Sequence, residues 1–178
     1  VGQISPHKGH EDFVEAAAHI SSRCPETVYL VVGEESANGS FVRKLRVSIL
    51  QKGLEKKFIF TGFTEDIPSA MGIIDVLAVA SLEEPFGMVI LEALAAGVPV
   101  VATDAGGPRE ILEHGRSGLL VTPRAPRELA EAIISVLSNH ELSGRLSRNG
   151  RQRVEQHYSL EFQVQQTADM FNELAACS

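Results

Sequence analysis

The most informative part of this sequence for the fold is "VLAVASLEEPFGMVILEALAAGVPVVATD", residues 76–104. Two short apolar runs, Val76–Ala80 and Val98–Ala102, flank a helical pattern at Gly87–Ala96. A run that is apolar at every position, rather than at every second one, is typical of a strand buried on both faces of a parallel sheet. The stretch therefore predicts a strand, a crossover helix and a second strand parallel to the first.

The same alternation continues along the whole chain. Four further apolar runs bring the expected strands to six, at Val1–Ile4, Val28–Val32, Phe58–Thr61 and Gly118–Val121. Helical patterns separate them, at Asp12–Ile20, Phe41–Gln51, Ser69–Gly72, Pro108–His114 and Pro126–Ser138. We therefore expect one α/β domain over residues 1–178, with a doubly wound, parallel, six-stranded, Rossmann-like sheet and helices on both faces. Two closing helices are expected over about residues 140–177, with Ser159 as the cap of the second.

Composition narrows the class of protein. The chain has 178 residues, is 44% hydrophobic, and carries a net charge of −7 without any tryptophan, so we expect a soluble domain that does not bind nucleic acid. Its two cysteines form no motif, which favours the reducing cytoplasm. Because Val1–Ile4 has the pattern of the end of a buried strand, we also expect a preceding domain in a longer protein.

Topology predicts where a ligand binds. In the commonest doubly wound strand order, the first and fourth strands are neighbours, and ligands bind beyond their carboxyl ends. The loops that leave the first, fourth and fifth expected strands are Ser5–Gly9, Ser81–Gly87 and Thr103–Glu110, all rich in glycine, proline and charge. We expect these three loops to converge on one crevice.

The helix that follows Pro85 is expected to begin at this crevice. Its first amides, those of Phe86, Gly87, Met88 and Val89, lack partners within the helix and point out of its start. Such a helix start, reinforced by the helix dipole, is a ready site for a phosphate.

Two glutamates flank the expected phosphate. The carboxylate of Glu92 can accept two hydrogen bonds from a ribose diol, and Glu84 can meet a sugar ring on the other side. The hydroxyl groups of the ligand are then expected to supply the hydrogen-bond partners of both carboxylates. The competing interpretation is that Glu84 only caps a helix and that Glu92 pairs with a structural Arg or Lys.

At these residues the sequence resembles a known family. "EPFGMVILEALAAGVPVVATDAGGPREILEHGRSGLLVTP", residues 84–123, is similar to the signature region of glycosyltransferase family four, retaining enzymes of the GT-B fold, and Glu84 and Glu92 match its E-x7-E motif. "VGQISPHKG" resembles the first-strand phosphate loop of that family, and "TGFTEDIPSAMGIIDVLAVAS" its base-binding segment. "RQRVEQHYSLEFQVQQTADMFNELA" resembles its closing helices. The resemblance implies the C-terminal, donor-binding half of a GT-B fold.

The resemblance also implies roles for residues. Glu92 would bind the ribose of a nucleoside diphosphate sugar, and Glu84, with the amides of Phe86 and Gly87, would hold the donor sugar. Lys8 and the amides of Met88 and Val89 would hold the diphosphate, and the backbone near Phe63 and Thr64 would meet the base. Glu84 and Lys8 are the expected catalytic residues. No metal is expected, because Lys8 and the helix start can stabilise the leaving group and no D-x-D signature occurs.

One position departs from the family pattern. Gln3 stands where the family usually has an arginine that helps Lys8 to neutralise phosphate. Glutamine donates a hydrogen bond but brings no charge. We expect weaker donor binding or slower turnover, unless Arg109 in the neighbouring loop compensates.

The implied function is transfer of a sugar from a UDP-sugar, or next a GDP-sugar, to an acceptor, without a cofactor. In this family the acceptor site and a catalytic histidine belong to an N-terminal domain, on which the closing helices would dock. We therefore expect the isolated domain to be inactive, and we leave open a peripheral membrane contact of the full-length cytoplasmic protein through that other domain. The alternatives are a sugar-nucleotide epimerase or phosphorylase of the same architecture, or an inactive nucleotide-binding interaction module. A dehydrogenase is disfavoured because G-x-G-x-x-G does not follow the first strand.

Overall fold

The strands of the protein form two parallel sheets. The structure, a computed structural model, describes residues 1–34 and 39–176. Its strands are β1 (Tyr29–Val32), β2 (Phe58–Gly62), β3 (Leu77–Val79), β4 (Val100–Thr103) and β5 (Leu119–Val121). β1 pairs with β2, while β4 lies between β3 and β5, and every pairing is parallel.

The prediction of one six-stranded sheet is wrong for the part of the chain that the structure describes. Val1–Ile4 is not a strand, although Gly2 N donates to Val32 O and Ile4 N to Glu34 O, each over 2.8 Å. The segment is therefore hydrogen-bonded to the chain at the end of β1 on one side. On its other side, the described structure shows no strand pairing between this segment and β3. The parallel α/β architecture is as expected, but the sheet is divided at the place of its first predicted strand.

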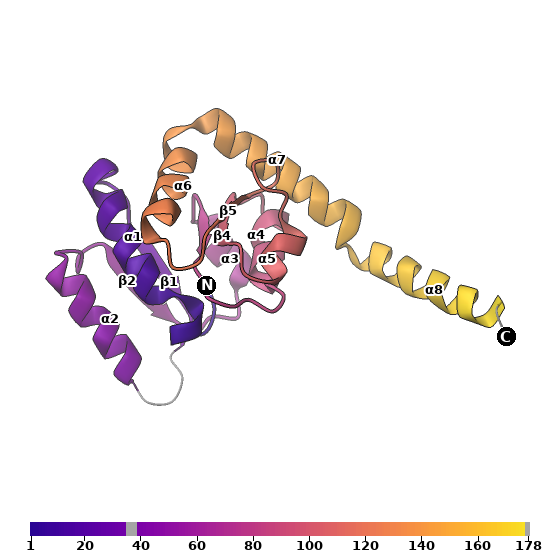
Figure 1. Ribbon diagram of the computed structural model, residues 1–178, viewed down its shortest axis with the longest axis horizontal. Coiled ribbons are helices and arrows are strands. Elements are labelled where there is room, and N and C mark those ends of the chain that lie inside the picture. Colours follow the sequence, from indigo (N-terminus) through magenta and orange to yellow (C-terminus); the bar gives the residue numbers. More distant parts are fainter. Residues whose placement is uncertain (35–38, 177–178) are drawn as a thin grey trace.

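Helices cover both faces of the strands, as predicted (Figure 1). They are α1 (His10–Arg23), α2 (Ser40–Gln51), α3 (Ile67–Gly72), α4 (Met88–Ala95), α5 (Gly107–Ile111) and α6 (Pro126–Ser138). All four residues of β4 are buried, with Val101 in a core shared with α1, α2 and α6, and Val100 and Ala102 in a core shared with α3, α4 and α5. Alternate residues of a strand face opposite sides, so burial on both faces explains why this run is apolar at every position.

Two closing helices complete the fold, α7 (His140–His157) and α8 (Leu160–Ala176). Ser159 Oγ accepts a hydrogen bond of 3.2 Å from Phe162 N, which confirms the predicted cap. α7 packs against α4 and α6, whereas α8 extends away from the rest of the molecule (Figure 1). In the described part of α8 no side chain is buried. Over the residues that the structure describes, no helix combines the length and apolar character that crossing a membrane requires.

Candidate functional site

Three loops meet at the carboxyl ends of the strands, as the topology predicted. Leu82 N donates to His7 O over 2.8 Å, which joins the loop after β3 to the loop that contains the short 3-10 helix η1 (Pro6–Lys8). Glu84 N donates to Ala105 O over 3.1 Å, joining the loop after β3 to the loop after β4. Main-chain bonds thus fix the three loops relative to one another.

The loop after β4 approaches the loop after β3 so closely that only glycine fits. Gly107 N donates to Glu84 O over 2.8 Å, and a Cβ at Gly107 would lie 2.0 Å from Phe86 O. No real contact is that short, so any side chain would push the two loops apart. The "GG" of "TDAGGPRE" therefore permits the contact that positions Glu84 and Phe86.

Glu84 is a buried carboxylate with two partners inside the protein. Its exposed fraction is 7%, Lys8 Nζ lies 2.6 Å from Oε2, and Ser81 Oγ donates to the same oxygen over 3.1 Å. The expectation that the ligand alone satisfies Glu84 is therefore wrong, because a buried carboxylate needs a counter-charge and Lys8 supplies one. The sequence analysis did not identify Ser81, which is almost fully buried, as a partner of Glu84. Its position as a polar residue at the end of a buried strand could have indicated this role.

The start of α4 lies beside this ion pair. Gly87 precedes the helix at φ 98°, a left-handed conformation that glycine adopts without strain, and its backbone is close to the side chain of Glu84. The amides of Met88 and Val89 open the helix, and the first turn carries no acidic residue. The helix start therefore presents amides and the positive end of its dipole next to Lys8.

Glu92 lies one turn into α4 and its side chain is exposed. Within the described residues it has no ion pair, so the competing interpretation of a structural Arg or Lys partner finds no support. Burial, together with the charge of Lys8, lowers the pKa of the Val1 ammonium, and the charge of Glu92 opposes this shift, so Glu92 lies within electrostatic reach of Val1. The carboxylate is thus open to solvent and available to a ligand.

The other predicted residues divide into two groups. Gln3, Lys8, Glu84 and Val89 line the same cavity. Phe63 and Thr64 follow β2, and in the described structure neither forms a hydrogen bond or an ion pair with Lys8 or Glu84. Phe63 is exposed, and Thr64 Oγ1 accepts from Asp66 N over 3.1 Å. They follow the carboxyl end of β2 but are not among the residues that line the cavity with Lys8 and Glu84.

Arg109, the candidate to compensate for Gln3, is engaged within its own loop. Its Nε donates to Asp104 Oδ1 over 2.7 Å, and this hydrogen bond lowers the pKa of Asp104. The guanidinium charge is therefore balanced locally before any ligand arrives. Sequence reasoning did not identify this partner.

Comparison with known proteins places this site in a family. A sequence model described as "Glycosyl transferases group 1" matches residues 1–153, which is most of the chain. The chain belongs to the group 1 glycosyl transferases.

Among curated relatives of this group, the alpha-D-kanosaminyltransferase of Streptomyces kanamyceticus is 31% identical over 176 residues, which cover 98% of this chain and 45% of the relative. The D-inositol 3-phosphate glycosyltransferase of Jonesia denitrificans is 30% identical over 160 residues, covering 87% of this chain and 38% of the relative. The chain thus spans less than half the length of these two relatives.

Solved structures share the fold of this chain. Anabaena Alr3699/HepE in complex with UDP and glucose superimposes with a TM-score of 0.87 at 34% identity, over 96% of this chain and 47% of that one. The C-terminal domain of the group 1 glycosyl transferase LpcC from Francisella tularensis superimposes with a TM-score of 0.84 at 32% identity, over 90% of this chain and 84% of that one. The likeness to a described C-terminal domain extends over nearly the whole of both chains.

Proposed function

We propose that this chain is the donor-binding, C-terminal domain of a retaining glycosyltransferase of family four with a GT-B fold. The observation that carries the proposal is the Lys8–Glu84 ion pair beside the start of α4, at the meeting point of three loops. The similarity to HepE, whose structure contains UDP and glucose, supports a nucleoside diphosphate sugar as ligand. The similarity to the LpcC C-terminal domain supports the assignment to that half of the fold.

The diphosphate would bind at the start of α4. The amides of Met88 and Val89 donate to phosphate oxygens there, and Lys8 approaches from the adjoining loop. An ammonium carries three donors, so Lys8 can bind a phosphate oxygen while one donor stays with Glu84. The side chain of Lys8 is 34% exposed and that of Glu84 is 8% exposed. An anion from solvent can therefore contact the ammonium of Lys8, while the carboxylate of Glu84 stays buried behind it.

The two acids would hold the sugars on either side of the diphosphate. Glu84, with the amides of Phe86 and Gly87, binds hydroxyls of the donor sugar near the reacting carbon. Glu92 accepts two hydrogen bonds from the ribose diol. The backbone around Phe63 and Thr64 meets the base, and Gln3 donates a neutral hydrogen bond to a phosphate.

Transfer breaks the bond between the anomeric carbon and the diphosphate, with retention of anomeric configuration. Negative charge then accumulates on the departing diphosphate, where Lys8 and the helix start stabilise it. Because these groups supply positive charge at the leaving group, we propose that the reaction requires neither a metal nor another cofactor.

The complete enzyme would require a second domain. We propose that an N-terminal domain supplies the acceptor site, and that the exposed apolar residues of α8, among them Leu160, Val164 and Phe171, dock on it. The isolated domain then binds the donor but transfers no sugar. In the cell the full-length protein would be cytoplasmic, with any contact to a membrane made through the N-terminal domain.

Calorimetric titration of residues 1–178 with UDP, UDP-glucose, GDP, GDP-mannose and NAD tests this proposal. UDP or GDP is expected to bind, and Glu92→Gln is expected to weaken binding by about tenfold to a hundredfold, the range for hydrogen bonds to a charged group. Glu128→Gln, an exposed glutamate in the first turn of α6, is the matched control and leaves binding unchanged. Binding of NAD alone would favour a dehydrogenase. Absence of binding by every nucleotide would favour the inactive interaction module.

A further inference from the structure

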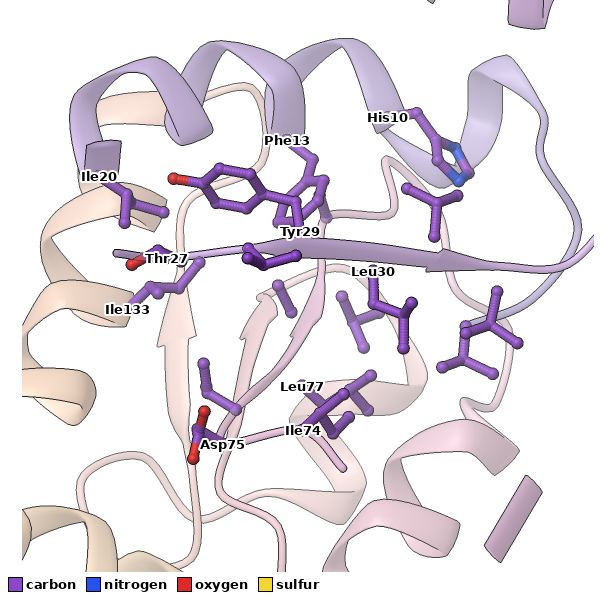
Figure 2. Close-up of a pocket in the computed structure, with 18 of the residues that line it drawn as sticks. His10, Phe13, Ile20, Thr27, Tyr29, Leu30, Ile74, Asp75, Leu77 and Ile133 are labelled. Atoms are coloured by element: carbon purple, nitrogen blue, oxygen red, sulfur yellow. The ribbon is translucent and has the colours of Figure 1, made fainter. Parts of the chain in front are cut away.

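A small pocket of about 100 Å³ lies between α7 and the loop that follows α5, and every residue that lines it is polar. The larger cavity shown in Figure 2 is by contrast lined mostly by apolar side chains, such as Phe13, Leu30 and Leu77. Lys8 and Glu84 line that larger cavity, and the two cavities are lined by different residues. The polar pocket is therefore separate from the site described above.

One face of α7 and the loop 113–117 form the two walls of the polar pocket. The lining residues of α7 follow Asn149 at spacings of three, four, seven and eight, so they share one face of the helix. Asn149 Nδ2 donates to Arg116 O over 2.9 Å, which joins the walls. Within the loop, Ser117 Oγ accepts from Glu113 N over 2.9 Å. Hydrogen bonds thus fix the shape of the pocket.

The pocket carries one positive charge more than its carboxylate balances. Glu113 Oε1 accepts from Arg153 Nη1, and Glu113 Oε2 accepts from Arg116 Nη1 over 3.0 Å. One carboxylate therefore bridges two guanidinium groups, which leaves a charge of +1 in a chain whose net charge is −7. The neighbouring acid on α7, Glu155, pairs with Arg151. The pocket is thus locally attractive to an anion.

Hydrogen-bond donors exceed acceptors in this pocket. A guanidinium has five N–H donors, and the bond to Glu113 uses one of those of Arg116. The side-chain amides of Gln152 and Gln156 form no hydrogen bond within the part of the chain that the structure describes. Both oxygens of Glu113, by comparison, already accept hydrogen bonds. A ligand that supplies acceptors and negative charge fits this arrangement.

Arg153 is held in place before any ligand binds. Its Nε donates to Ile111 O and its Nη2 donates to Glu110 O over 3.0 Å, at the end of α5. The side chain of Arg153 is 21% exposed, whereas that of Arg116 is 73% exposed. One arginine therefore forms a fixed wall, and the other is free to move onto a bound ion.

The volume of the pocket limits the ligand. Pockets for drug-sized ligands measure about 300–1,000 Å³, so this one is too small for a nucleotide. A water molecule takes about 30 Å³ of liquid, so the pocket has room for about three waters or for one compact oxyanion. A tetrahedral phosphate can accept from the loop and from α7 at once, whereas a carboxylate accepts within one plane, and guanidinium groups bind phosphate through paired N–H donors.

We propose that this pocket binds a phosphate group. Arg116 and Arg153 are its cationic partners, and the side-chain amides of Gln152 and Gln156 are its neutral donors. The pocket recognises the group itself, which inorganic phosphate and a small phosphate monoester share. A bound phosphate bridges α7 and the loop 113–117. The inference does not depend on the proposed function, because other residues form the site at the start of α4.

NMR titration of residues 1–178 with inorganic phosphate, at an ionic strength held constant with chloride, tests this inference. Constant ionic strength removes the general effect of screening. The side-chain amide signals of Gln152 and Gln156 are expected to shift and to reach saturation. Arg116→Gln is expected to weaken phosphate binding by about tenfold, because it removes a charge-assisted hydrogen bond. Since Arg116 is exposed, this variant keeps the fold.

Arg151→Gln is the matched control. Arg151 lies on the same helix and is exposed, but it pairs with Glu155 and does not line the pocket, so phosphate affinity should change by less than about twofold. Equal weakening by Arg116→Gln and Arg151→Gln would overturn the proposal, because the effect would then be one of overall charge.

The NMR signals also show where phosphate binds. The backbone amides of Met88 and Val89 report on the start of α4, and phosphate that shifts these signals but not those of Gln152 and Gln156 would overturn the proposal. Acetate that binds in the pocket as tightly as phosphate would do so as well. Glycerol phosphate distinguishes the two sources of the group: tighter binding than inorganic phosphate indicates a monoester, and weaker binding indicates the free ion.

Discussion

Lys8 Nζ lies 2.6 Å from Glu84 Oε2, although 76 positions separate the two residues. The side chain of Glu84 is almost sealed from solvent, whereas that of Lys8 remains partly open. The pair therefore holds two loops together and still presents a cation at the start of α4. A site of this kind is organised before its ligand arrives, which reduces the entropy that must be lost on binding.

Lys8→Met is expected to destabilise the fold by roughly 1–3 kcal/mol, because it leaves the buried Glu84 carboxylate with Ser81 as its remaining side-chain partner. Glu84→Gln keeps the shape of the side chain and removes its charge. The variant that combines Lys8→Met with Glu84→Gln is therefore expected to be more stable than the sum of the two single changes predicts. Urea unfolding of the four proteins measures the coupling.

Lys44→Met is the matched control for this change. Lys44 Nζ lies 3.9 Å from Glu11 Oε1, and both side chains are largely exposed, so the free energy of unfolding should change by less than about 0.5 kcal/mol. If Lys8→Met were as mild as Lys44→Met, the ion pair would not support the site.

Gly107→Ala is expected to lower the free energy of unfolding by about 2 kcal/mol or more, because its Cβ would meet Phe86 O at 2.0 Å. The loop after β4 must then move away from Glu84, so UDP affinity should fall as well. Gly72→Ala is the control, since a Cβ there would meet nothing within 4 Å. Thermal unfolding and UDP titration measure both effects, and a Gly107→Ala protein as stable as Gly72→Ala would contradict the close approach.

Much of the fold follows from local pattern. A strand buried on both faces must be apolar at each position, and β4 satisfies this rule at Val100, Val101 and Ala102. The convergence of the loops followed from topology, because parallel strands end at the same edge of the sheet. These features could be predicted because each depends on the periodicity of one segment or on the order of segments.

The remaining features depend on which groups meet across the chain. Periodicity does not indicate that Lys8 and Ser81 both bind Glu84, or that Asp104 holds Arg109. Nor does an apolar run reveal whether both of its neighbours pair with it, which is why Val1–Ile4 was predicted as a strand. A strand requires partners, and the described structure offers this segment a partner on the β1 side only.

Gln3→Arg is expected to strengthen UDP binding by about tenfold, because it replaces a neutral donor by a charged one in the cavity that Lys8 also lines. Arg109→Ala is expected to change the affinity by less than about twofold, since Asp104 already balances its charge. Titration calorimetry at fixed ionic strength measures both variants. A large loss in Arg109→Ala would restore Arg109 as the group that compensates for Gln3.

Deletion of residues 160–178 is expected to change the unfolding free energy of the remaining chain by less than about 1 kcal/mol, because no described side chain of α8 is buried. Removing the exposed Leu160, Val164 and Phe171 should also reduce self-association at high concentration. Thermal unfolding and sedimentation measure the two properties. An unfolded or aggregated product would show that α8 stabilises the domain itself.

His10 is expected to make the stability of the domain depend on pH. Burial lowers the pKa of its imidazole, with Lys8 and the chain amino group acting in the same direction and a hydrogen bond with Ser5 O opposing them. The unfolded chain therefore binds a proton first as the pH falls below about 6.5, so the free energy of unfolding decreases from there down to the pKa of the folded state. Urea unfolding at about pH 7.5 and about pH 5.5 should show this decrease, and His10→Gln should reduce it. NMR titration of the imidazole supplies the direct check, because a His10 that titrates at or above its ordinary pKa would remove the cause of the effect.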